Sequence, residues 1–157
     1  MDVVKAGRGP RVLIVEDNRA VCRLLSLVIR RRGYACDLAG SIEEARFLLR
    51  KEDYGILILD FTLPDGAGTN VLKDRLEFAS GAMYLIITGN DDLDLADLAA
   101  CNGVYDVIAK PFTLARFEER LSEVVEIYNR KSASSMQEDH NEKPGGEDIG
   151  RAKKSTA

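Results

Sequence analysis

The chain has 157 residues, enough for one domain with a sizeable hydrophobic core and a short further segment. Apolar residues make up 45% and charged residues 31%, as in ordinary soluble domains, and a net charge of −4 argues against a broad basic surface for nucleic acid. No apolar run approaches the roughly 20 residues that span a bilayer, and the N-terminus lacks the apolar stretch of a signal peptide. The three cysteines are far apart and have no metal-binding spacing, so we expect a cytoplasmic protein with reduced thiols.

Strand and helix patterns alternate through the first half of the chain. The β-branched run at residues 11–15 predicts a strand, and apolar residues at helical spacing from residue 18 predict a helix that ends at Gly33. Residues 34–39 have the weaker alternating pattern of a second strand. The sequence Ser-x-x-Glu that begins at Ser41 is a capping box, which predicts the start of a second helix.

The same alternation continues in the second half. Continuous apolar runs at residues 56–59 and 83–87, and a largely apolar run at 104–109, predict three more strands. A helix is predicted after each of them: one after the turn residues Pro64 to Gly66, one from a run of aspartates that starts at Asp91, and a long last one capped by Thr113.

Five strand–helix units in succession predict an α/β domain, with a parallel sheet covered by helices on both faces. The nearly continuous apolar strands agree with this, because both faces of each strand would be buried. We assign residues 1–10 to a short arm and 11–130 to the domain. Residues 131–157 have few large apolar side chains and many charges, so we expect them to form a disordered tail.

Polar residues with related chemistry follow the strands of the predicted sheet. Strand one is followed by Glu16 and Asp17, strand three by Asp60, strand four by Thr88 and strand five by Lys110. Ligands of such sheets bind at the carboxyl ends of the strands. If strands one and three are neighbours, as in the order 2-1-3-4-5, three carboxylates converge there, and each pair at ~4 Å repels by about 4 kcal/mol at an effective dielectric constant near 20.

A cation would relieve this repulsion, and carboxylate oxygens are the ligands that Mg²⁺ prefers. Asp60 is then a candidate nucleophile for a phosphoryl group, with Lys110 and the Thr88 hydroxyl as further contacts to the anion. A single Asp after a strand is more often a turn or helix-cap residue, and so is an acidic pair before a helix. The prediction therefore rests on the whole set of residues at one edge of the sheet.

This set resembles the receiver domain of two-component response regulators. The motifs VLIVEDN, ILILDFTLPDGAG, LIITGNDD and DVIAKPF are similar to that family's acid-pair strand, phosphoacceptor strand and loop, threonine strand and lysine strand. The resemblance covers roughly residues 10 to 130. It implies a (βα)5 doubly wound, flavodoxin-like fold with strand order 2-1-3-4-5 and a cis peptide bond between Lys110 and Pro111.

The resemblance also implies a role for each site residue. Asp60 would accept a phosphoryl group from a phosphohistidine on a sensor histidine kinase or a phosphotransfer protein. The ligands of Mg²⁺ would be Glu16, Asp17, Asp60 and the backbone carbonyl of Thr62. The Lys110 ammonium would pair with the phosphoryl group, and the Thr88 hydroxyl would move to bind it, which repacks the face made by helix four, strand five and helix five.

Further positions concern regulation. Thr62 and Asn90 stand where the family tunes dephosphorylation. The family usually has Tyr or Phe three residues before the lysine, and here Val107 stands in that place. Tyr105 lies two residues earlier, with the same expected strand parity, but close to the start of the strand. We therefore weigh two interpretations: simple surface packing at residue 107, or altered coupling between phosphorylation and the output face.

The expected activity is that of a phosphoacceptor that assists its own phosphorylation and dephosphorylation, and not that of an enzyme with a separate substrate. A downstream protein target is expected, with no direct DNA binding, no membrane contact and a possible homodimer; the aspartates of helix four favour a protein partner. No effector motif follows residue 130, so the chain is either a free-standing receiver or part of a longer protein. The lone His140, in the predicted tail, is not expected to carry a phosphoryl group.

Three alternatives belong to other classes of protein. A phosphatase of the haloacid dehalogenase type would need a second Asp where Thr62 stands. A nucleotide- or flavin-binding domain would need a Gly-rich or Ser/Thr-rich loop after the first strand, where the chain has Glu-Asp-Asn. A receiver-like interaction module that is not phosphorylated stays open, and treatment with acetyl phosphate and Mg²⁺ would distinguish it.

Overall fold

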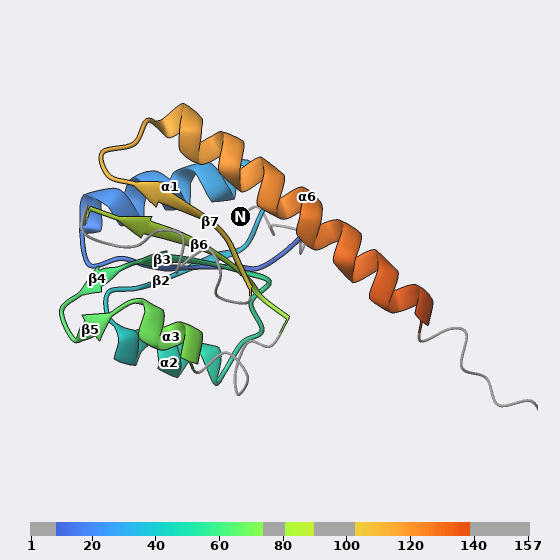
Figure 1. The fold of residues 1–157 in the computed structure, drawn as a ribbon, viewed down its shortest axis with the longest axis horizontal. Helices are drawn as coiled ribbons and strands as arrows, with labels where there is room; N and C mark the ends of the chain where they lie inside the picture. Colours follow the sequence, from blue (N-terminus) through green and yellow to red (C-terminus); the bar gives the residue numbers. More distant parts are fainter. Residues whose placement is uncertain (1–8, 74–80, 90–102, 139–157) are drawn as a thin grey trace, which may run out of the picture.

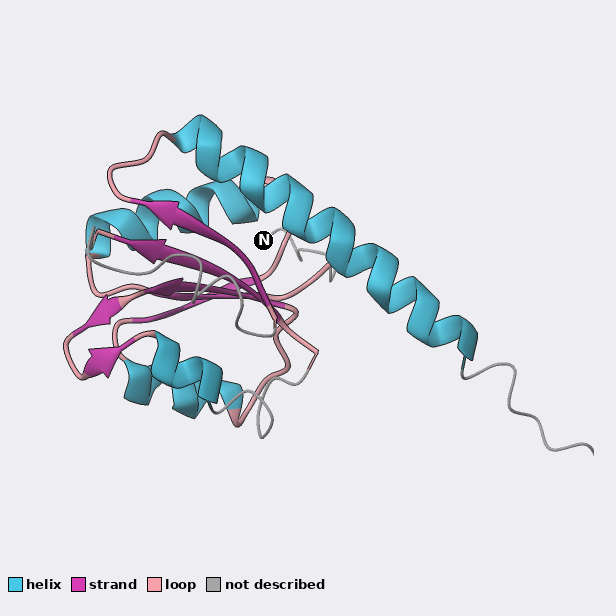
Figure 2. Ribbon diagram, viewed as in Figure 1, coloured by secondary structure: helices cyan, strands magenta, loops and turns pink. Residues whose placement is uncertain are grey.

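A computed structural model describes residues 9–73, 81–89 and 103–138. Its main sheet has five parallel strands in the order β2-β1-β3-β6-β7, which is the predicted order 2-1-3-4-5, and helices cover both faces (Figures 1 and 2). The α/β, flavodoxin-like prediction is therefore confirmed. The strands of this sheet are β1 (Val12–Val15), β2 (Cys36–Ala39), β3 (Ile56–Asp60), β6 (Met83–Thr88) and β7 (Val104–Ala109).

Two hydrophobic cores lie on opposite faces of the sheet. Helices α1 (Arg19–Arg31) and α6 (Leu114–Glu138) cover one face, and α2 (Ile42–Leu49) and α3 (Thr69–Lys73) cover the other (Figure 1). Every residue of β1, β3 and β6 is buried, so alternate side chains of each strand enter the two cores. This burial fixes the strands that carry the candidate site residues.

The helix boundaries follow from local capping. The side chain of Asn18 accepts hydrogen bonds from the backbone amides of Ala20 and Val21 and so caps α1, and Gly33 ends that helix with a φ of +85°. Ser41 caps α2, as the capping box predicted. The Glu44 carboxylate, however, accepts from the amide of Gly40, one residue before the cap.

Helix α6 continues beyond the predicted domain boundary at residue 130. Residues 131–138 are helical, so the prediction of disorder from residue 131 is wrong for them. They contain neither Gly nor Pro, and their helix continues one whose earlier turns are already packed, so no new nucleation is needed. The side chains of Ser134 and Ser135 accordingly bond back to carbonyls one turn earlier. These last turns project away from the sheet (Figure 1).

Strand β7 contains an irregularity that the sequence pattern did not predict. Tyr84 of β6 lies opposite Val104, but the next residue, Leu85, lies opposite Asp106. Tyr105 is therefore an extra residue on β7. Such a bulge interrupts the alternation of side chains along a strand.

The bulge separates Tyr105 from Val107, so the predicted common parity of these two residues is wrong. Tyr105 packs against the core under α1 and α6, and its hydroxyl donates a 2.9 Å hydrogen bond to Glu123 of α6. Val107 pairs with Ile86 of β6. The residues on either side of Ile86 belong to that same core, so Ile86 itself points to the opposite face of the sheet. Val107 therefore faces the other side of the sheet.

Several predictions lie outside the described residues. These are residues 1–8 of the predicted arm at 1–10, the later part of the third helix, the aspartate-rich fourth helix with Asn90, and the tail from residue 139 with His140. Within the described ranges no helix is both long and apolar enough to cross a bilayer, and Cys22 and Cys36 are buried free thiols.

Candidate functional site

The polar residues predicted to lie at strand ends meet at one edge of the sheet. Asp60 is the last residue of β3 and Thr88 the last of β6, while Glu16 directly follows β1 and Lys110 directly follows β7. Because Val15 pairs with Leu59, the chain places Glu16 beside Asp60. The parallel register of buried strands therefore determines the geometry of the site.

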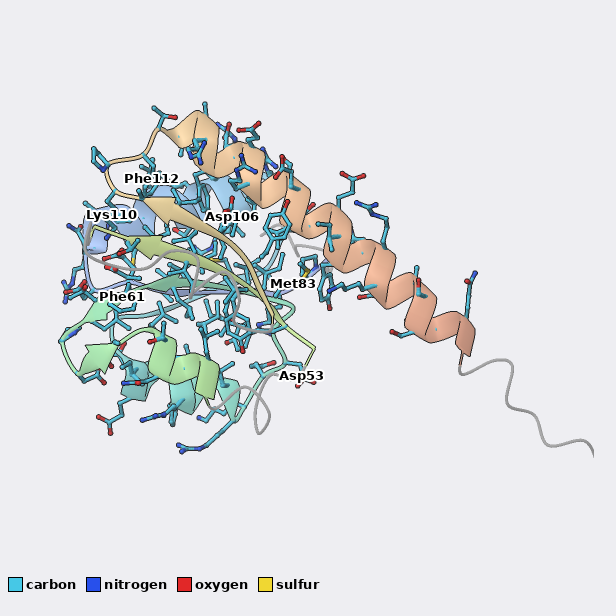
Figure 3. The ribbon with its side chains drawn as sticks, in the orientation of Figure 1. Asp53, Phe61, Met83, Asp106, Lys110 and Phe112 are labelled. Carbon is cyan, nitrogen blue, oxygen red and sulfur yellow. The ribbon has the colours of Figure 1, made fainter. Side chains whose placement is uncertain are left out.

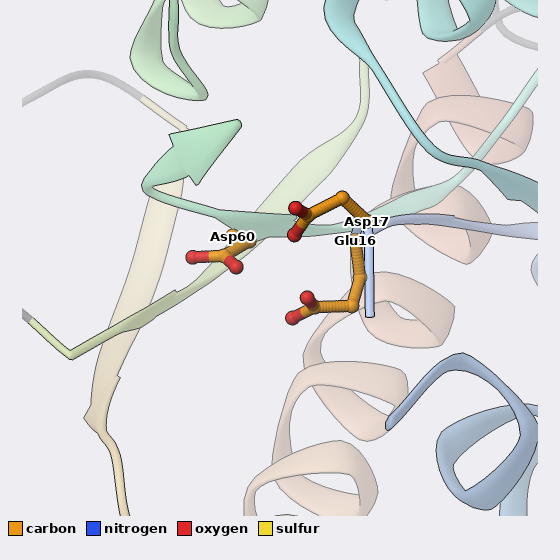
Figure 4. Close-up of side chains that lie close together, drawn as sticks. All are labelled: Glu16, Asp17 and Asp60. Carbon is orange, nitrogen blue, oxygen red and sulfur yellow. The ribbon is translucent and has the colours of Figure 1, made fainter. Parts of the chain in front are cut away.

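Three carboxylates converge there. One carboxylate oxygen from each of Glu16, Asp17 and Asp60 lies within 4.8 Å of the others, and the three side chains lie close together in Figure 4. Glu16 is only 3% exposed and Asp60 only 6%, whereas Asp17 is exposed. Two of the three charges are thus removed from most of the solvent that would screen their repulsion.

Lys110 joins two of these carboxylates. Its ammonium nitrogen donates to Glu16 Oε2 at 2.9 Å and to Asp60 Oδ2 at 3.0 Å. The other oxygen of Glu16 accepts from the backbone amide of Asn18 at 3.0 Å, and that of Asp60 accepts from the amide of Thr62 at 3.1 Å. Both oxygens of each buried carboxylate are therefore hydrogen-bonded, which offsets the cost of burying them.

The pKa values respond to this environment. Burial raises the pKa of Glu16, and the neighbouring charge of Asp60 adds to the rise, although the hydrogen bonds from Asn18 and Lys110 oppose it. For Lys110, burial lowers the pKa, but the hydrogen bonds and charges of Glu16 and Asp60 outweigh burial and raise it. The ammonium is therefore firmly protonated, while Glu16 ionises less readily than an exposed Glu.

The donor set suits a hard divalent cation. The groups that converge are carboxylate oxygens from three residues, with no thiol or imidazole among them, and one of the carboxylates faces solvent. Such oxygen ligands favour Mg²⁺ over softer metals. Glu16, Asp17 and Asp60 fit the predicted metal site, and Thr62 lies beside it, with its amide bonded to Asp60.

The loop after Asp60 is folded tightly around the site. It forms a small antiparallel hairpin of β4 (Thr62–Leu63) and β5 (Gly66–Ala67), with the predicted turn at Pro64 and Asp65 between them. Gly68 then packs directly on the backbone of Asp60: a Cβ there would lie 1.9 Å from the Asp60 carbonyl oxygen. A glycine is required at this position because of that close approach, and its φ is not positive.

The remaining predicted residues occupy the neighbouring strand ends. Thr88 is 2% exposed and its carbonyl accepts a 2.6 Å hydrogen bond from the amide of Lys110, which links β6 to the lysine. The peptide bond from Lys110 to Pro111 is cis, as the resemblance implied. Lys110 and Phe112 lie just after the end of β7 in Figure 3. Asn90 lies outside the described residues.

The capping interpretation of the acidic residues is only partly correct. Asn18, and not Glu16 or Asp17, caps α1, so the acid pair is free for the site. Asp60 does accept from the amide two residues on, as a turn residue would, while it also contacts Lys110. The sequence analysis missed Asp65, which bonds to amides more than twenty residues away and so leaves no local pattern.

Comparison with known proteins gives a consistent family. The family model described as the response regulator receiver domain matches residues 12–122. Among curated proteins, the chain is 33% identical over 130 residues to the transcriptional regulatory protein PmrA of Pectobacterium parmentieri, covering 83% of this chain and 59% of PmrA. It is 29% identical to BasR of Escherichia coli strain K12, covering 80% of this chain and 57% of BasR. The chain thus spans less than two thirds of these relatives.

Two solved structures of similar fold are described as receiver domains. The beryllofluoride-activated NtrC4 receiver domain dimer has a TM-score of 0.68 and 30% identity, covering 75% of this chain and 98% of that one. A CheY-like receiver domain protein from Methanospirillum hungatei JF-1 has a TM-score of 0.70 at 23% identity, covering 77% and 97%. At that identity it supports the fold alone. On the family match and the PmrA relationship together, the chain belongs to the response regulator receiver domain family of two-component systems.

Proposed function

We propose that this chain is a cytoplasmic phosphoacceptor that receives a phosphoryl group on Asp60 from a sensor histidine kinase or a phosphotransfer protein. The observation that carries the proposal is the convergence of three carboxylates and the Lys110 ammonium around Asp60. A purely structural ion pair would need one acid and one base. Three acids around one base favour a site for a divalent cation and a phosphoryl anion.

In the proposed transfer, an oxygen of the Asp60 carboxylate attacks the phosphorus of the donor phosphohistidine. The new O–P bond forms as the P–N bond breaks, and the imidazole nitrogen leaves with the electron pair. The Lys110 ammonium, already 3.0 Å from Asp60, pairs with a phosphoryl oxygen. When bound by Glu16, Asp17, Asp60 and the Thr62 carbonyl, Mg²⁺ supplies neutralisation of the negative charge on the transferring group.

The same residues would control how long the phosphoryl group persists. Thr62 and Asn90 tune the hydrolysis of the acyl phosphate by controlling access of water. The Thr88 hydroxyl hydrogen-bonds the phosphoryl group and moves toward it. The chain therefore promotes chemistry on its own side chain and does not turn over a separate substrate.

The proposed output surface is the face of the fourth helix, β7 and α6, through which the phosphorylated chain binds a protein target or a second copy of itself. The dimeric NtrC4 receiver offers a precedent for the second copy. In this chain α6 and β7 are linked by a polar network, because Arg120 contacts Asp106 at 3.2 Å and Glu123 at 2.8 Å while Glu123 accepts from Tyr105. Direct DNA binding is not part of the proposal.

Coupling to this surface is proposed to be altered in this chain. Val107 has no ring that could change its position behind Thr88, and Tyr105 is fixed on the α6 side of the sheet by Glu123. The beryllofluoride complex tests this. Small amide shifts over residues 91–128 would support altered coupling, and full-size shifts there would reject it.

The direct test of the function is intact-mass measurement after incubation with acetyl phosphate and Mg²⁺. We expect one added phosphoryl group on the wild-type chain, its loss with hydroxylamine, and none in Asp60→Asn. Asp53→Asn is the matched control, because Asp53 is an exposed acid outside the site, and it should be phosphorylated like the wild type. A folded wild-type chain that stays unmodified would instead support the alternative, an interaction module that is not phosphorylated.

A further inference from the structure

Asp65, at the tip of the β4–β5 hairpin, makes contacts that its place in a turn does not require. Its two carboxylate oxygens accept hydrogen bonds from the backbone amides of Ile42 at 2.9 Å and Glu43 at 3.0 Å, the first two residues of α2. These bonds also hold the pKa of Asp65 below its usual value. Asp65 thus supplies a second cap to α2 from a distant part of the chain.

This contact closes a ring of backbone connections around the carboxylates. Asp60 leads through the hairpin to Asp65, and Asp65 is bonded to the start of α2. Three residues before Ile42, the carbonyl of Ala39 at the end of β2 accepts a 2.9 Å bond from the amide of Glu16. Two routes therefore connect Glu16 to the loop after Asp60. One is the pairing of β1 with β3, and the other runs through β2, the start of α2 and Asp65.

Thr62 begins the hairpin that carries this second connection. It is the first residue of β4, pairs with Ala67 across the hairpin, and is exposed. Its amide bonds to the Asp60 carboxylate, and the adjacent Leu63 is buried in the core with Ile42. The hydrogen bonds of Asp65 thus connect the turn of the hairpin directly to the first two residues of α2.

We propose that Asp65 is a positioning residue for the metal site: by linking the hairpin to the N-terminus of α2, it holds Thr62 in place relative to Asp60 and Glu16. This inference rests on the proposed function, because it assigns Asp65 to the support of the same cation site. Residues that orient metal ligands typically change metal affinity by about 10- to 100-fold when they are removed. We expect about a tenfold weakening of Mg²⁺ binding in Asp65→Ala, at the low end because Asp65 is exposed.

The chain offers a matched control at the same helix terminus. Ser41 caps α2 through the amide of Glu44 at 3.1 Å, but it precedes the helix and does not connect to the hairpin. Ser41→Ala therefore weakens the α2 terminus and leaves the link to Thr62 intact. Asp65→Asn keeps one acceptor oxygen and should give an intermediate result.

The chain has no tryptophan, so Mg²⁺ binding is best followed by calorimetry on the full chain and by amide NMR. Thermal unfolding of each variant is measured in parallel. The inference is supported if Asp65→Ala binds Mg²⁺ about tenfold more weakly than Ser41→Ala, while the two variants have similar melting temperatures. Equal affinities in these two variants would overturn it.

A second readout needs no metal. The amide resonance of Thr62 reports its hydrogen bond to Asp60, so it should shift in Asp65→Ala, shift less in Asp65→Asn and stay unchanged in Ser41→Ala. If the wild-type chain binds no Mg²⁺ at all, the proposed function fails, and the Thr62 resonance still decides whether Asp65 positions the hairpin. An unshifted Thr62 resonance in Asp65→Ala would overturn the inference even if Mg²⁺ binds to the wild type.

Discussion

Replacing Lys110 by Met tests whether the site is held together by one cation. Methionine keeps much of the length of the side chain and removes its charge. In the metal-free protein the variant leaves Glu16 and Asp60 next to each other without the ammonium that now contacts both, at 2.9 and 3.0 Å. We therefore expect the substitution to destabilise the fold.

The size of the effect follows from the burial of the three side chains. The Glu16 and Asp60 side chains are 2% and 7% exposed, and that of Lys110 is 28% exposed. Removing one partner of a buried ion pair costs about 3–5 kcal/mol. Because the lysine is partly solvated, we expect about 3 kcal/mol at neutral pH, the lower end of that range.

The loss should depend on pH in a defined direction. Burial already raises the pKa of Glu16, and the charge of Asp60 raises it further, so without Lys110 the folded state favours the protonated acid more strongly. A carboxyl group whose pKa is higher in the folded than in the unfolded protein stabilises the fold at a pH below its pKa in the unfolded chain. This stabilisation is lost as the pH rises through its pKa in the folded protein. The difference between variant and wild type should therefore shrink from pH 7 toward about pH 4.

Urea unfolding followed by circular dichroism, without divalent ions, measures the difference. Mg²⁺ at about 100 times its dissociation constant should then return about 2.7 kcal/mol to the variant. Lys51→Met is the control, because Lys51 is exposed and lies over the Phe47 ring, and it should cost less than about 1 kcal/mol. If Lys110→Met costs no more than this control, the carboxylates do not need the lysine and the electrostatic reasoning is wrong.

Three further predictions concern the scaffold. Gly68→Ala should cost about 1–3 kcal/mol in urea unfolding and weaken phosphorylation, because its Cβ would collide with the Asp60 carbonyl. The control is Gly81→Ala, which has open space around its Cβ and should be neutral or slightly stabilising. For Asp37, burial raises the pKa, but hydrogen bonds from Arg11 and Tyr54 outweigh burial and lower it. Asp37→Asn should therefore cost roughly 1 kcal/mol of stability at neutral pH. This difference from the wild type should vanish as the pH falls below about 4, where Asp37 becomes protonated. Tyr105→Phe removes the hydroxyl bond to α6 and should cost about 1 kcal/mol by thermal unfolding; no change would mean that this bond does not hold β7 to the helix.

The five strands and the polar residues at their carboxyl ends could be predicted from short local patterns, and the strand order was implied by the motif resemblance. Apolar runs such as residues 56–59 specify buried strands, and a parallel sheet brings all their carboxyl ends to one edge. The position of Asp60 beside Glu16 then follows from the neighbouring places of β1 and β3. The motif resemblance supplied the roles, and the geometry agrees with the positions that it implied.

The features that could not be predicted depend on contacts between distant segments. The bulge at Tyr105 arises from the register between β6 and β7, and a strand pattern assumes strict alternation. The capping of α2 by Asp65 joins residues more than twenty positions apart. The helical residues 131–138 have too little apolar surface to order themselves, and they are helical as the continuation of a helix whose earlier turns are packed.

The charge balance of the site gives a physical reason for a divalent ligand. Three carboxylates and one ammonium, all ionised, leave two negative charges uncompensated, and among the described residues no cation lies within ion-pair distance of Asp17. The buried strands prevent relief by backbone movement, because β1 and β3 are paired along their whole shared length up to the site. The charge of Asp60 accordingly contributes to the raised pKa of Glu16. A divalent cation would neutralise the remaining charge and leave the Asp60 carboxylate available as a nucleophile.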